Sequence, residues 1–151
     1  MINFKDYIKN LPDYKKCKYN HDEYLEWKNV DFEVECEFYE VGKLSIKPFL
    51  NESSKYWGKD TPMNLNEYPY YGCKIYSCKE CNSLFFYYDE LGYHYPQDRF
   101  RLIRKELIND YSLELVKDVV IDLNSSSENF FSKIKKVLND FKRTKYLFTS
   151  T

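Results

Sequence analysis

The chain has 151 residues, 43% of them hydrophobic, with 23 basic and 24 acidic side chains and a formal net charge of -1. This composition excludes a disordered chain, and the length predicts a single domain, residues 1–151, with its own core. The balanced charge disfavours a nucleic-acid binder held by bulk positive charge. The N-terminus lacks the apolar core of a signal peptide and no apolar run is long enough to span a bilayer, so a cytoplasmic protein is expected.

Two short helices are predicted near the N-terminus. Apolar residues recur at helical spacing over 4–11, and Pro12 ends that run. Asn20 and Glu23 form a capping-box pattern, which predicts the start of a second helix.

The clearest predicted strand covers 31–38, where apolar and acidic residues alternate strictly. Residues 40–43 are typical of a turn, and 44–49 then return with the same alternation. The sequence therefore predicts an antiparallel hairpin here. Lys43 and Lys47 on the returning strand would lie close enough to pair with the acidic side chains of the first strand.

The rest of the chain predicts further strands and one long helix. A long loop is expected over 51–69, and the strands expected after it cover 71–76, 84–88, 99–103 and 115–123. A capping-box pattern at 125–128 then precedes an apolar stripe at helical spacing: Phe130, Phe131, Ile134, Val137, Leu138 and Phe141. These elements predict an α+β domain, in which an antiparallel β-sheet is covered by the C-terminal amphipathic helix and accompanied by short N-terminal helices.

The five cysteines leave two interpretations open. Cys78 and Cys81 lie in a CxxC turn like that of a zinc knuckle, with Asn82 suited to a left-handed backbone. A structural zinc site needs two more ligands, and Cys73 and His94 lie nearest along the chain. Three other candidates are more distant in sequence: Cys17, His21 and Cys36. Because one CxxC is only half of a zinc signature, a hairpin turn with reduced thiols and no cofactor is the favoured interpretation.

No catalytic residues are predicted, because no nucleophile has a His–acid pairing nearby in the sequence and the four glycines are isolated. The charge distribution is more informative than the total. Residues 22–40 hold eight acidic side chains and one lysine, whereas 133–145 hold six basic side chains and one acid. An acidic strand face can bind a basic partner with fast electrostatic steering. The predicted partner-binding residues on it are Asp31, Glu33, Glu35 and Glu37.

The segment from Tyr76 to Gly92, continuing through His94, Pro96 and 99–103, resembles small bacterial immunity proteins. Genes for such proteins lie beside contact-dependent or other polymorphic toxins. The family pattern often has Gly-Gly-His after the acidic residue, whereas this chain has Gly-Tyr-His. The resemblance implies a non-enzymatic protein that neutralises one cognate toxin, such as a nuclease, by binding its basic surface.

Two hypotheses follow from the sequence. The first is an immunity protein that binds its toxin through the acidic strand, with the aromatic loop of Tyr93, His94 and Tyr95 as a second candidate contact. The second is a small zinc-stabilised module that binds nucleic acid or protein.

Overall fold

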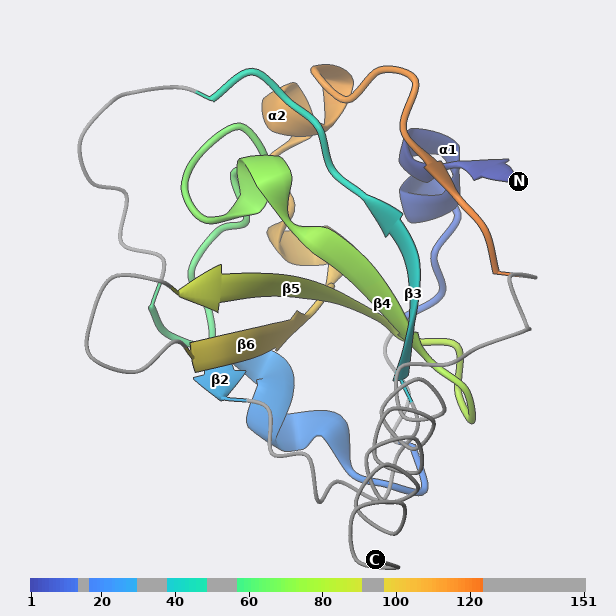
Figure 1. Cartoon of the computed structure of the whole chain (residues 1–151), viewed down its shortest axis with the longest axis vertical. Coiled ribbons are helices and arrows are strands. Elements are labelled where there is room, and N and C mark those ends of the chain that lie inside the picture. Colours follow the sequence, from blue (N-terminus) through green and yellow to red (C-terminus); the bar gives the residue numbers. More distant parts are fainter. Residues whose placement is uncertain (14–16, 30–37, 49–56, 91–96, 124–151) are drawn as a thin grey trace, which may run out of the picture.

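The computed structural model describes residues 1–13, 17–29, 38–48, 57–90 and 97–123. The predicted strand over 31–37 and the predicted C-terminal helix therefore lie outside the described residues. Within them, the chain combines antiparallel sheets with short helices, as an α+β protein does (Figure 1).

A five-stranded antiparallel sheet forms the centre of the described part, in the order β2-β6-β5-β4-β3. These strands are β2 (Lys28–Asn29), β3 (Phe38–Lys43), β4 (Lys74–Cys78), β5 (Leu84–Glu90) and β6 (Gln97–Leu102). A second, two-stranded sheet pairs β1 (Ile2–Asn3) with β7 (Val120–Ile121). The predicted strands over 84–88 and 99–103 are thus confirmed, because β5 and β6 cover nearly the same residues.

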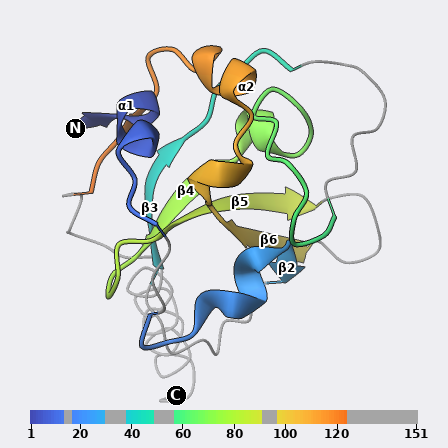
Figure 2. The ribbon, with the colours of Figure 1, turned by 180° about the vertical axis from the view of Figure 1, so that it is seen from behind.

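The helices are all short. They are α1 (Phe4–Lys9), α2 (Asp110–Glu114) and the 3-10 turns η1 (His21–Leu25), η2 (Tyr70–Gly72) and η3 (Lys105–Leu107). The two predicted N-terminal helices are present, the second as the 3-10 turn η1. Seen from behind, η1 lies beside β2 and β6, while α1 and α2 lie at the opposite end of the structure (Figure 2).

The predicted hairpin between 31–38 and 44–49 is wrong. Residues 40–43, predicted as a turn, belong to β3, and 44–48 form no strand. β3 pairs instead with β4, with Phe38 opposite Cys78 and a register shift between Glu40 and Gly42. The prediction placed the partner of this strand next to it along the chain, whereas β3 pairs with β4, a segment distant in sequence. The other predicted strands also shift, since 71–76 contains η2 before β4 and 115–123 yields only the short β7.

Side chains on the two faces of the sheet form two hydrophobic clusters. The first cluster includes Ile75, Phe86 and Tyr88 and is joined by residues of α1 and of the 63–73 segment. The second cluster includes Phe38, Phe85 and Phe100 and is joined by Tyr24 of η1. The strands of the sheet centre are buried on both faces, which explains why β5 is almost continuously apolar. The second face positions the site described next.

Candidate metal centre

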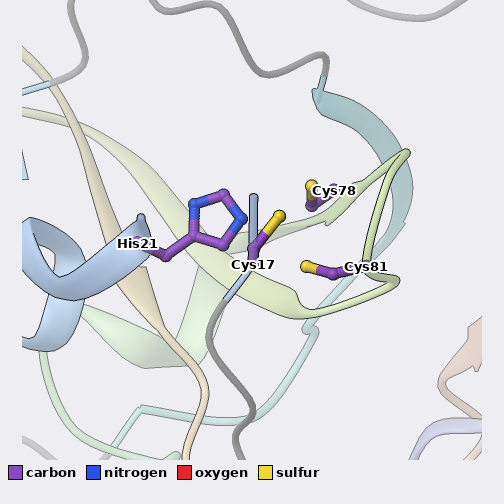
Figure 3. Close-up of side chains that lie close together, drawn as sticks. All are labelled: Cys17, His21, Cys78 and Cys81. Carbon is purple, nitrogen blue, oxygen red and sulfur yellow. The ribbon is translucent and has the colours of Figure 1, made fainter. Parts of the chain in front are cut away.

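Four potential metal ligands converge beside the second hydrophobic cluster. Cys17, His21, Cys78 and Cys81 each offer one ligand atom, and all four atoms lie within 4.8 Å of one another. Cys78 ends β4 and Cys81 lies in the turn that follows it, whereas Cys17 lies just before η1 and His21 is the first residue of η1 (Figure 3). Two distant parts of the chain therefore meet at this point.

A local turn brings Cys17 and His21 together. The Asn20 amide donates to the Cys17 carbonyl at 3.1 Å, which reverses the chain just before η1. Asn20 has a positive φ of 48° and caps η1, because its side-chain oxygen accepts from the Asp22 amide. His21 is the first residue of η1, so its ring is placed over the sheet by this cap.

A tight turn places the two other cysteines. The Asn82 amide donates to the Cys78 carbonyl at 2.8 Å, and the Cys78 amide donates to the Ser83 carbonyl at 3.0 Å. Asn82 has a φ of 59°, which confirms its predicted left-handed conformation. The turn leaves both thiols on the side that faces His21 (Figure 3).

Among the described residues, the Nε2 atom of His21 lacks the hydrogen-bond partner that a buried imidazole nitrogen normally has. His21 is 1% exposed, and the centroid of its ring lies 5.0 Å from the centroid of the Phe85 ring in an edge-on arrangement. The Nε2 atom is buried and makes no hydrogen bond of normal geometry in the described part of the chain. A buried nitrogen of this kind costs free energy unless it binds something. The neighbouring thiols make a metal ion the ligand that would satisfy it.

The thiols also favour a cation between them. A hydrogen bond with the Cys78 thiol raises the pKa of Cys81, burial adds to the effect, and His21 and Ser83 oppose it. Crowded thiols resist losing their protons because the resulting negative charges repel each other. A divalent cation would reverse this balance, since it binds the thiolate form.

The ligand set matches zinc. Zinc binds thiolate sulfur at about 2.3 Å and imidazole nitrogen at about 2.0 Å in a tetrahedron, so neighbouring ligand atoms lie about 3.5 Å apart. Since the four ligand atoms lie within 4.8 Å of one another, the distances between them need to shorten by only about 1 Å to bind the ion. Three cysteines and one histidine are a common structural zinc set, and they leave no coordination position for a substrate.

The sequence named all four residues of this site as candidate ligands but ranked Cys17 and His21 behind Cys73 and His94. Cys78 and Cys81 belong to it, but the structure joins them to Cys17 and His21 rather than to Cys73. Cys73 lies with the first cluster, on the other face of the sheet, where its thiol donates to the Pro69 carbonyl at 2.9 Å. Burial raises the pKa of that thiol. His94, the other near candidate, lies outside the described residues.

The sequence also held a spacing signal for the two candidates that were ranked lower. Cys17 and His21 are separated by three residues, a spacing that lets one turn present both side chains to the same ion. Distance along the chain counted against them, although zinc ligands commonly come in two such pairs that are far apart in sequence.

The predicted partner-binding residues have no described position. Asp31, Glu33, Glu35, Glu37, Tyr93, His94 and Tyr95 all lie outside the described residues. Of the lysines expected to pair with the acidic strand, Lys43 lies opposite Lys74 in the sheet and Lys47 is in no strand. Lys74 is 3.9 Å from the Glu40 carboxylate, so the ion pair seen here joins β3 to β4.

No protein-family model, curated protein or solved structure shows significant similarity to this chain. Among the described residues, no helix combines the length and the apolar character needed to cross a membrane.

Proposed function

We propose that this chain is a non-enzymatic protein-binding domain whose fold is stabilised by one zinc ion bound to Cys17, His21, Cys78 and Cys81. The observation that carries the proposal is the convergence of these four ligand atoms within 4.8 Å. Four protein ligands complete a tetrahedral shell, so the ion has a structural role and no open position for catalysis.

The zinc ion would fasten the N-terminal segment to the sheet. Tyr24 packs edge-on against Phe38 and Phe85, so η1 covers the second cluster. η1 spans only five residues, and so short a helix needs tertiary support. Metal binding at its first residue supplies that support, because the free energy of zinc binding becomes free energy of folding.

The partner within this proposal is a bacterial toxin with a basic surface. Support comes from the acidic run over 22–40 and from the resemblance to immunity proteins. A protein that acts by binding needs a rigid scaffold, and a structural zinc site helps to supply one.

The metal is tested by elemental analysis of full-length protein purified without a histidine tag. We expect about one zinc per chain in the wild type, and loss of zinc in Cys78→Ser and His21→Ala. Unfolding in urea should show that Cys78→Ser lowers the free energy of unfolding by about 3 kcal/mol.

Cys73→Ser is the matched control, because Cys73 is a buried cysteine directly before β4 that packs in the first cluster and lies outside the ligand set. It should keep its zinc. Cobalt substitution gives an independent reading, since tetrahedral thiolate ligation produces intense visible and near-ultraviolet absorption. A folded wild-type chain without metal, equal in stability to Cys78→Ser, would contradict the proposal.

A further inference from the structure

One residue of the proposed ligand set, Cys81, also lines a cavity. This cavity of about 450 Å³ lies between the end of the α1 segment, the turn after β4, and residues 102–106. Its wall includes Leu11, Asp13, Cys81 and Lys105. A volume of this size admits small molecules.

Accessibility separates Cys81 from the neighbouring ligands in the cluster. Cys78 and His21 are buried, whereas Cys81 is half-buried and lines the cavity. Cys17 is also half-buried as a residue, but it does not line this cavity. The Cys81 thiol lies 3.1 Å from the Ser83 hydroxyl, which is itself part of the cavity wall. A small reagent in the cavity therefore reaches Cys81 before it reaches Cys78.

We propose that Cys81 is a modification site, at which a peroxide that enters this cavity oxidises the zinc centre and releases the metal. The inference rests on the proposed function, because it requires a bound zinc ion. A metal-bound thiolate remains a nucleophile, and the susceptibility of cysteines to oxidation follows thiolate character and exposure.

The reaction balances in two steps. The Cys81 thiolate attacks one peroxide oxygen, so that an S–O bond forms, the O–O bond breaks and hydroxide leaves to become water. The Cys78 thiolate then attacks the Cys81 sulfur, forming the disulfide and expelling the second oxygen as water. The two sulfurs lose two electrons and the peroxide gains them. Cys78 is the resolving thiol because its Sγ lies within 4.8 Å of the Cys81 Sγ and both belong to the same short turn. Zinc loses two of its four ligands and dissociates.

The test uses the zinc-loaded Cys36→Ser variant, because Cys36 lies outside the described residues and its thiol would confuse the analysis. The variant is treated with stoichiometric hydrogen peroxide. The zinc content of this variant is measured first. A metallochromic indicator follows zinc release, while quenched samples are alkylated, digested and mapped by mass spectrometry. We expect one zinc released for every two thiols lost, with a Cys78–Cys81 disulfide as the main product. Cys73 should stay reduced on the same timescale.

A second measurement maps accessibility without oxidation. Limiting N-ethylmaleimide should label Cys81 roughly tenfold faster than Cys78 in the zinc-loaded protein, and zinc loss should follow the Cys81 label. Zinc release with Cys81 intact, or first modification at Cys17 or Cys78, would overturn the inference and leave the proposed function standing. A protein that holds no zinc before treatment would refute the proposed function itself.

Discussion

Two carboxyl groups share a proton at one end of the sheet. Asp89 of β5 lies directly opposite Asp98 of β6, and the Tyr87 hydroxyl donates to Asp89 at 2.7 Å. Burial and the hydrogen bond with Asp89 raise the pKa of Asp98 to about 6. The same hydrogen bond, now accepted from Asp98, lowers the pKa of Asp89. Below about pH 6 the pair therefore holds one proton, which lies on Asp98.

This pair predicts how stability depends on pH. Because the pKa of Asp98 is higher in the folded state than the ordinary value of 3.8, the folded chain binds a proton more tightly than the unfolded chain. Stability from this group is present below about pH 4 and is lost as pH rises to about 6. Asp98→Asn keeps a donor toward Asp89 without the charge, and should raise the free energy of unfolding at pH 7.5 by about 1 kcal/mol, after discounting for solvent screening.

Urea titrations of the wild type and Asp98→Asn at pH 4.5 and pH 7.5 check this expectation. Acid also protonates the metal ligands, but that effect is common to both proteins and cancels in their difference. Asp60→Asn removes a charge from an exposed turn and serves as the control. A stability difference between Asp98→Asn and wild type that is the same at both pH values would show that the shared proton does not exist.

At the scale of elements, one buried arginine joins three segments. Arg101 of β6 is fully buried and donates to the carbonyls of Leu25, Gly58, Lys59 and Thr61 and to the Tyr70 hydroxyl. The shortest of these bonds, to Tyr70, is 2.6 Å. The guanidinium thus gives backbone carbonyls of the 57–61 turn the donors that strand pairing does not supply.

Arg101→Met should lower the free energy of unfolding by roughly 3 kcal/mol, because it fills similar space but leaves several carbonyls without donors. Arg101→Lys keeps the charge but lacks the planar set of five donors, so it should recover only part of the loss. Urea denaturation measures both, and hydrogen exchange should show faster exchange in the 57–61 turn. Equal stability of Arg101→Met and wild type would contradict this role.

The sequence predicted those elements whose patterns are local. The apolar spacing of 4–11 identified α1, and the segments 84–88 and 99–103 identified β5 and β6, because burial of each segment leaves a local pattern. The partner of β3 was missed, since no local pattern states which strand will cover Phe38. The sequence also did not predict that β7 lies against β3. In the structure the two strands lie so close that a Cβ added at Gly42 would be 2.8 Å from the Val120 carbonyl oxygen. Strand pairing and metal ligation both depend on contacts between distant segments, and these leave weak traces in a single sequence.

At the scale of the whole molecule, the acidic run predicts salt-dependent association with a basic partner. Glu33→Lys with Glu35→Lys should weaken binding to the basic toxin proposed as the partner by about 3 kcal/mol, because like charges would then face each other. Association of the wild type should slow as salt rises, since steering is screened over about 10 Å at ordinary ionic strength. Stopped-flow association and calorimetry measure the two effects.

The result is meaningful only if the double variant remains folded. Its circular dichroism and zinc content, compared with those of the wild type, test this. Glu106→Lys, at an exposed position in η3, is the matched single-charge control and should leave affinity unchanged. If the double reversal leaves affinity unchanged as well, the acidic strand is not the binding surface.

The metal centre also sets an order of assembly for the chain. Each of its halves is local: the turn after β4 brings Cys78 and Cys81 together, and the turn before η1 brings Cys17 and His21 together. In the proposed zinc centre, either half alone would offer the ion only two ligands, so a partly folded chain would hold zinc in a weak and exchangeable form. The four-ligand shell closes only when η1 docks on the sheet, which makes tight metal retention a late event and an indicator that the second face has been completed.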